Sequence, residues 1–181
     1  WSTQLTSLDV SQNTALTSLY CGSNQLTSLD VSQNTALTSL NCSYNQLTTL
    51  DVSNNTALTY LECDNNQLTT LDVRNGNNQN MLPPYDINAT NNSNLYCIDV
   101  DDVVWSTANW TSPYEIDTWT SFSLNCSLAG CLDPLACNYN PLAWIDDSSC
   151  TYYGCTNATA CNYDSTATCD DGSCILTAGC T

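Results

Sequence analysis

A 21-residue repeat occupies the first third of the chain and constrains its fold more than any other feature. The copies at 5–25, 26–46 and 47–67 are nearly identical, and a fourth begins at Leu68 and then diverges. Each copy contains two halves, of the form LxxLxVxxN and LxxLxCxxN. A coil this short cannot enclose a hydrophobic core by itself, so successive coils must stack and share one.

Parallel stacking at about 4.8 Å places equivalent residues of successive coils in columns. We expect the leucine and valine columns to lie inside, and the asparagines to form ladders that satisfy backbone groups at the turns. The ladders are Asn13, Asn34, Asn55 and Asn24, Asn45, Asn66. The cysteines Cys21, Cys42 and Cys63 replace a leucine of the pattern, so we interpret them as a buried thiol ladder. The alternative is strained disulfides between coils.

The pattern LxxLxCxxNxL resembles the strand-and-turn signature of leucine-rich repeats. Its form LTSLDVSxNTALTxLxCxxNQ, over residues 5 to 75, resembles secreted bacterial surface proteins of the Bacteroidetes type. The resemblance implies a mainly β fold: a short curved solenoid over 1–75 with almost no helix. It also identifies 76–128 as a C-terminal cap, in which Cys97 and Cys126 would pair, and 129–181 as small disulfide-rich modules.

Four aspartates, Asp9, Asp30, Asp51 and Asp72, form one outward column of the predicted solenoid. Like charges about 5 Å apart repel by roughly 1 kcal/mol per neighbouring pair even in water. Calcium along the column would relieve this repulsion. The preferred interpretation is a solvated acidic face.

Charge and composition exclude several classes of function. The chain has 18 acidic residues and one basic residue, Arg74, with a net charge of −17. This balance argues against binding to nucleic acid or anionic membranes. Without histidine or lysine the chain lacks Ser-His-Asp, Cys-His and Schiff-base chemistry. The carboxylate cluster Asp99, Asp101 and Asp102 implies no cleft between two acids, so we expect no enzyme activity.

The middle segment contains Trp105, Trp110, Trp119 and Phe122, which we interpret as the core of the cap. A solenoid needs such a cap, because an exposed last coil invites aggregation. The alternative is a sugar-stacking platform at an exposed Trp110.

A second, 24-residue repeat fills the C-terminal part at 131–154 and 155–178. The chain has 13 cysteines, crowded toward this end, which indicates an oxidising, extracellular compartment. The simplest pairings are Cys137–Cys150 and Cys161–Cys174, although eight cysteines allow 105 arrangements. Cys169 has no counterpart in the first module, where Ile145 stands. This module resembles the GCTDPxACNYxPxAxxDDGSC repeats of secreted bacterial proteins.

Oxygen-bearing side chains cluster in the loops of both modules and are candidate calcium ligands. They are Asn138, Asn140, Asp146, Asp147, Asn162, Asp164, Asp170 and Asp171. The preferred interpretation is that they are turn-forming residues that cap backbone groups. Apart from such calcium we expect no cofactor.

An extracellular chain can also carry glycans at its sequons. The candidate sites are Asn54, Asn88, Asn91, Asn109, Asn157 and, in a sequence that resembles a bacterial O-glycosylation site, Ser165.

Two functions fit these features. The first is a non-enzymatic extracellular structural protein that forms a surface filament or stalk by head-to-tail self-association. It is suggested by the two ends of the chain, because Trp1 opens within a repeat and 179–181 resembles a third module. We therefore expect a longer natural protein. The second is an adhesin that recognises protein or glycan through the solenoid. Its candidate face comprises Tyr20, Asn41, Glu62, Asp9, Asp30 and Asp51. No apolar run reaches the length of a membrane span.

Overall fold

The computed structural model describes residues 4–82, 86–111, 115–141, 143–146 and 148–176. The chain divides into two units, Trp1–Asn125, which we call the solenoid, and Cys126–Thr181, which we call the tail. The expected start of a third module at 179–181 lies outside the described residues.

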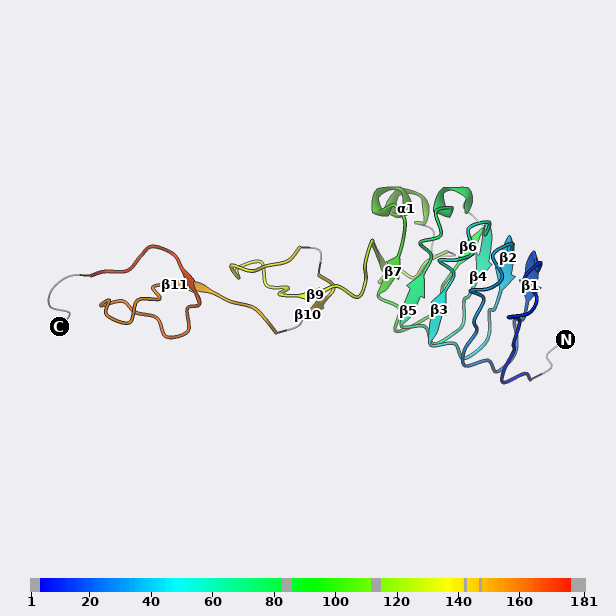
Figure 1. The fold of residues 1–181 in the computed structure, drawn as a ribbon, viewed down its shortest axis with the longest axis horizontal. Helices are drawn as coiled ribbons and strands as arrows, with labels where there is room; N and C mark the ends of the chain where they lie inside the picture. The colour runs from blue at the N-terminus through cyan, green and yellow to red at the C-terminus, as the bar shows by residue number, and fades with distance from the viewer. Residues whose placement is uncertain (1–3, 83–85, 112–114, 142, 147, 177–181) are drawn as a thin grey trace. The chain divides into compact units, whose positions relative to one another are not determined.

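The solenoid is built from short parallel strands in two sheets, one strand from each half of a coil (Figure 1). The first sheet contains β1 (Ser18–Tyr20), β2 (Ser39–Asn41), β4 (Tyr60–Glu62) and β6 (Ile87–Asn88). The second sheet contains β3 (Thr49–Asp51), β5 (Thr70–Asp72), β7 (Cys97–Asp99) and β8 (Ser121–Ser123). Leu19, Leu40 and Leu61 pair in register, so one sequence repeat is the step from one coil to the next.

Stacking buries the predicted apolar columns. The central coils are fully enclosed, since Leu40, Leu61 and Val52 are each 0 % exposed. The three ladder cysteines are free and buried, as the thiol-ladder interpretation expects. In the first coil, by contrast, Leu5 is 41 % exposed.

The asparagine ladders close the turns as predicted. The Asn45 Oδ1 accepts from the Leu26 N–H at 2.9 Å, and its Nδ2 donates to the carbonyls of Cys21 and Cys42 at 3.1 and 3.0 Å. Asn66 repeats this arrangement one coil later. Each amide therefore joins neighbouring coils and satisfies backbone groups that the bend leaves unpaired.

Beyond residue 75 the segment expected to be a cap first continues both sheets. β6 pairs with β4, and β7 pairs with β5 so that Ile98 lies beside Leu71. Asn92 extends the second asparagine ladder, because its Oδ1 accepts from the Leu68 N–H at 3.0 Å. The segment also contains a 3₁₀ turn, η1 (Asn78–Asn80), and a short helix, α1 (Val103–Asn109). Asp102 caps the N-terminus of this helix, because its Oδ1 accepts from the Trp105 N–H at 3.0 Å.

Tryptophans pack the end of the solenoid. Trp110 is 2 % exposed, its Nε1 donates to the Met81 carbonyl at 3.0 Å, and its ring lies 5.6 Å from that of Trp105 and 5.8 Å from that of Phe122. The proposed sugar platform at an exposed Trp110 is therefore wrong, because burial of this large ring completes the core.

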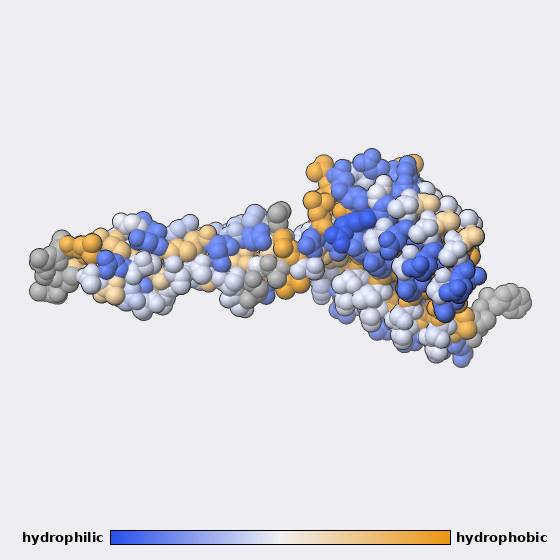
Figure 2. Space-filling model, in the orientation of Figure 1, coloured by the Kyte–Doolittle hydropathy of each residue, from blue (hydrophilic) through white to orange (hydrophobic). Residues whose placement is uncertain are grey.

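The tail has little regular structure. β9 (Ala129–Gly130) pairs with β10 (Ile145–Asp146), and one module later β11 (Tyr153–Gly154) pairs with β12 (Cys169–Asp170). The buried apolar residues among those described are Cys131, Ala136, Cys155 and Ala160. Figure 2 shows hydrophobic residues at the tail surface, as expected for a unit with so small a core.

The predicted pairings Cys137–Cys150 and Cys161–Cys174 are wrong. The structure instead pairs Cys131 with Cys150, Cys155 with Cys174 and, between the modules, Cys137 with Cys169. Pairing of β9 with β10 explains the first of these bonds, because it brings the residues that follow each strand together. The six cysteines named for disulfides, including Cys97, Cys126 and Cys161, are all disulfide-bonded. The pairing of Cys97 with Cys126 stays a prediction.

Candidate functional site

The outward column of the first sheet differs from coil to coil. Its residues are Tyr20 on β1, Asn41 on β2, Glu62 on β4 and Asn88 on β6, and they lie in register. The leucine before each of the first three residues points inward, so strand alternation turns this column outward. Here the chain carries an aromatic ring, an amide, a carboxylate and a second amide on one surface.

The turns that follow these strands add a second polar column. It contains Gly22, Ser43 and Asp64, and the Ser43 hydroxyl donates to the Asp64 carboxylate. The two columns are linked, since the Ser43 N–H donates to Asn41 Oδ1 at 3.2 Å and the Asn41 amide donates to Glu62. These bonds hold the polar side chains in fixed positions.

Glycine is needed at the first of these turn positions. A Cβ at Gly22 would lie 2.7 Å from Asn41 Oδ1 and 3.1 Å from the Ser43 carbonyl oxygen. Such contacts would displace the Asn41 amide. Gly22 therefore leaves room for the side chain that the next coil presents.

A shallow pocket of about 330 Å³ lies between the two columns and the turns beside them. We call it the polar hollow. Its lining residues are Gly22, Ser23, Asn41, Ser43, Tyr44, Glu62, Asp64 and Asn88. Tyr44 is 60 % exposed and has a left-handed backbone conformation, with φ of 55°, so its ring stands at the surface.

The polar hollow is acidic, with carboxylates from Glu62 and Asp64 and no basic side chain among its lining residues. Tyr60, on the same strand as Glu62, has a raised pKa because of burial, a hydrogen bond to Glu62 and the negative charge of that carboxylate. The hollow thus offers carboxylates, amides, hydroxyls and an aromatic ring to a polar or cationic partner.

The structure divides the predicted binding face between two sheets. Asn41 and Glu62 line the polar hollow, and Tyr20 lies in the same column, where its hydroxyl is 3.2 Å from that of Ser39. Asp51 ends β3 of the second sheet, and Asp9 and Asp30 occupy the same position in earlier coils. The predicted face therefore draws on two sheets, because the two halves of each coil enter different sheets, and its role as one binding face stays a prediction.

The aspartate column closes turns. Each carboxylate accepts from the backbone N–H two residues later, at 2.9 Å for Asp9, 2.9 Å for Asp30 and 2.8 Å for Asp51. These bonds lower the pKa values of Asp9 and Asp30. Arg74 pairs with the last member of the column, Asp72, and with Asp99 beside it on β7, at nitrogen–oxygen distances of 2.5 and 3.8 Å. This arrangement matches the solvated face with turn-forming carboxylates and gives calcium no added support.

The cysteines of the thiol ladder are expected to be unreactive. Burial raises the pKa of Cys21 to about 11 and raises those of Cys42 and Cys63 further. Thiolate is the reactive form of cysteine, so these side chains act as small apolar groups.

The candidate calcium ligands of the tail bind backbone groups. Asn138 Nδ2 donates to the Ser149 carbonyl at 2.7 Å while its Oδ1 accepts from the Thr151 N–H at 2.9 Å, and Asn162 repeats both bonds in the second module. Asp146, Asp164, Asp170 and Asp171 each accept from an N–H two residues later. Asp147 lies outside the described residues, and Asn140 has bonded partners. Within the described ranges, no three His, Cys, Asp or Glu side chains gather as a metal site.

The candidate glycan sites differ in accessibility. Asn54, Asn91, Asn157 and Ser165 are exposed, whereas Asn88 and Asn109 are half-buried. The Asn109 amide donates to the Trp105 carbonyl at 2.8 Å, and Asn88 lines the polar hollow. The four exposed sites are therefore better placed for modification than the other two.

Sequence reasoning did not assign most of the polar hollow to the binding face, namely Gly22, Ser23, Ser43, Tyr44, Asp64 and Asn88. A signal was present for Ser43 and Asp64, because each follows a ladder cysteine at a position that varies between coils. Asn88 was hidden by the insertion after residue 75, which makes the step from Glu62 to Asn88 longer than the step from Asn41 to Glu62.

One family model agrees with the repeat architecture. Residues 35–76 match the family model of leucine-rich repeats, two copies. A solved structure, the functional domain of InlJ from Listeria monocytogenes, which includes a cysteine ladder, is 45 % identical with a TM-score of 0.41, over 52 % of this chain and 22 % of that one. The chain thus spans about a fifth of the protein it matches. No curated protein gives a significant match. No helix in the described part of the chain has the length and hydropathy needed to cross a membrane. The chain carries leucine-rich repeats.

Proposed function

We propose that this protein is a non-enzymatic extracellular adhesin that binds a protein or glycan partner at the polar hollow of the first sheet. The observation that carries this proposal is the hollow itself. Its side chains vary along the solenoid while the columns beneath them repeat, so the variable positions can set the choice of partner without affecting the core.

Several further features support the proposal. Disulfides in the tail are typical of an oxidising compartment outside the cell. The exposed Tyr44 ring offers an amphipathic anchor, and such rings are enriched at binding hot spots. Glu62 and Asp64 favour a partner that presents hydrogen-bond donors or positive charge.

Binding of the labelled chain to arrays of glycans and of extracellular proteins tests this function. We expect Tyr44→Ala and Glu62→Gln each to lower affinity at least tenfold, which corresponds to about 1.4 kcal/mol. Asp51→Asn is the matched control, because it also removes one carboxylate charge from a strand end but lies on the second sheet. Equal binding by all of these variants, with unchanged melting temperatures, would exclude the hollow as the binding site.

Self-association into a filament is the second candidate, supported by the exposed Leu5 of the first coil. A second copy of the chain can cover this coil, and so can a segment that precedes it. Negative-stain electron microscopy of the native secreted material distinguishes the two. Regular fibres that disappear in Leu5→Glu would support the filament, and discrete particles at every concentration would refute it.

A further inference from the structure

The disulfide pattern of the tail determines how its chain responds to tension. Cys131–Cys150 and Cys155–Cys174 each close a loop with a sequence separation of 19. Tension applied to the ends of 131–174 passes through the first bond, along 150–155 and through the second bond. The residues inside both loops carry no load while these bonds are intact.

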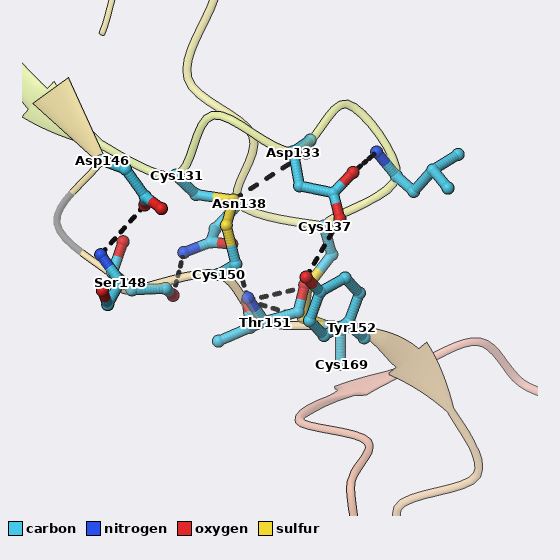
Figure 3. The surroundings of a disulfide bond; sticks show 12 residues. Cys131, Asp133, Cys137, Asn138, Asp146, Ser148, Cys150, Thr151, Tyr152 and Cys169 are labelled. Atoms are coloured by element: carbon cyan, nitrogen blue, oxygen red, sulfur yellow. Dashed lines mark hydrogen bonds between the residues drawn. A yellow bond between two sulfur atoms is a disulfide. The ribbon is translucent and has the colours of Figure 1, made fainter. Parts of the chain in front are cut away.

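The third bond, Cys137–Cys169, joins the two modules beside this path (Figure 3). The segment 150–155, which connects the two modules, positions the two cysteines of this bond through backbone hydrogen bonds. The Cys137 N–H donates to the Thr151 carbonyl at 2.9 Å, while the N–H groups of Thr168 and Cys169 donate to the Tyr152 carbonyl at 3.0 and 3.1 Å. Adjacent residues of one short connection thus hold both modules and bring the two cysteines together.

This arrangement also explains why the repeat is imperfect. Ile145 of the first module occupies the position of Cys169 in the second, and each residue begins the strand that pairs with the two residues just before its module. The connecting bond runs from the second cysteine of one module to the additional cysteine of the next. In the first module an apolar residue takes the position, because the described chain contains no earlier module of this type to which it could bond.

We propose that 131–174 is a load-bearing tether in which Cys137–Cys169 provides a second load path. If Cys131–Cys150 is lost, tension runs from Cys131 to Cys137, across the bond to Cys169, and on to Cys174. This route follows only the short backbone segments 131–137 and 169–174 instead of the whole opened loop. Loss of Cys155–Cys174 leaves the same route, so one bond protects against either failure.

The lengths involved are large enough to measure. At roughly 3.5 Å per extended residue, loss of either loop bond should lengthen the tether by about 20 Å when the second path is present. Without the second path, and without the separate disulfide of Cys161, the same loss should release about 60 Å. Non-covalent contacts cannot substitute for it, since the described tail buries so few apolar residues.

Single-molecule force spectroscopy on the full oxidised chain, held by tags at both ends, tests the proposal. All chains carry Cys161→Ser, because Cys161 lies inside the second loop and forms a disulfide of its own that would shorten the released length. Against this background we expect Cys137→Ser/Cys169→Ser to leave the contour length unchanged. Cys131→Ser/Cys150→Ser and Cys155→Ser/Cys174→Ser should each be longer by about 20 Å, and combining either pair with Cys137→Ser/Cys169→Ser should give about 60 Å.

A gain of about 60 Å on loss of either loop bond alone would overturn the proposal, because it is the length expected without a second path. Peptide mapping of the wild-type chain under non-reducing conditions provides a check that does not depend on how the variants fold. Recovery of Cys137 linked to Cys169 supports the second path, and recovery of Cys137 linked to any other cysteine refutes it.

Discussion

The solenoid and the tail start from the same difficulty and overcome it differently. Each is built from a repeat too short to fold alone, a 21-residue coil in the solenoid and a 24-residue module in the tail. The solenoid stacks its coils, so that residues such as Leu61 become fully buried. The tail leaves large side chains exposed, including Tyr153 at 59 %, and holds its modules with disulfides. Repetition alone therefore does not determine how a chain is stabilised.

Reduction of the disulfides should produce the largest difference in stability between the two units. Each disulfide that closes a loop with a sequence separation of 19 contributes about 3 kcal/mol, and the tail has little else to hold it. With dithiothreitol we expect amide protection over 131–174 to disappear, while β2 and β4 stay protected and Cys42 stays unmodified by iodoacetamide. Hydrogen exchange followed by mass spectrometry measures this difference. Simultaneous loss of protection in β2 and β4 would contradict it.

A core truncation should show the opposite selectivity. Leu61→Ala opens a cavity at a fully buried site of the solenoid and should lower its free energy of unfolding by about 3 kcal/mol. The matched change in the tail, Leu135→Ala, affects a side chain that is 80 % exposed and should stay within about 0.5 kcal/mol. Urea denaturation measures both changes. A large effect of Leu135→Ala would mean that the tail has a core in solution.

Acid should produce the smallest difference, at the ion pair on the second sheet. Desolvation opposes ionisation of Asp72, but the hydrogen bonds and charge of Arg74 outweigh it and lower the pKa of this carboxyl. The stabilisation is therefore complete above the unfolded pKa, about 3.9, and is lost as the pH falls through the folded value. The pair is partly exposed, so we expect less than about 1 kcal/mol.

Urea titrations of the wild type and Asp72→Asn at several pH values measure this contribution. The advantage of the wild type should be present at pH 6 and should decrease as the pH is lowered toward 2. Arg74→Gln should give the same pattern. An advantage that grows toward pH 2 would mean that the carboxyl is stabilised in its protonated form.

The sequence predicted the solenoid well because each column is repeated. Leucine recurs at the same inward position in every repeat, as in the column Leu19, Leu40 and Leu61, so each repeat independently indicates which residues pack inside. The same spacing predicts the ladder formed by Asn45 and Asn66. The strands after residue 75 were missed because Ile87 and Ile98 follow their partners Leu61 and Leu71 at a longer step than the repeat. Insertions of this size make the 21-residue sequence period undetectable, although the strands still pair in the register of the earlier coils.

The candidate site and the disulfides were less predictable, for a different reason. The polar hollow depends on which turn residues lie beside Asn41 and Glu62, and a one-dimensional pattern does not contain that adjacency. The pairing of Cys137 with Cys169 depends on hydrogen bonds from Thr151 and Tyr152. Spacing alone favoured the nearer Cys150.

The register between coils has a consequence for how such a protein can change over generations. A tandem duplication of one repeat unit adds a coil whose leucines, cysteine and asparagines enter existing columns, so the longer chain can fold at once. Only the residue at the position of Tyr20, Asn41 and Glu62 needs to differ for the new coil to present a new group. The binding specificity can thus change through one substitution per coil, while the buried core residues stay the same.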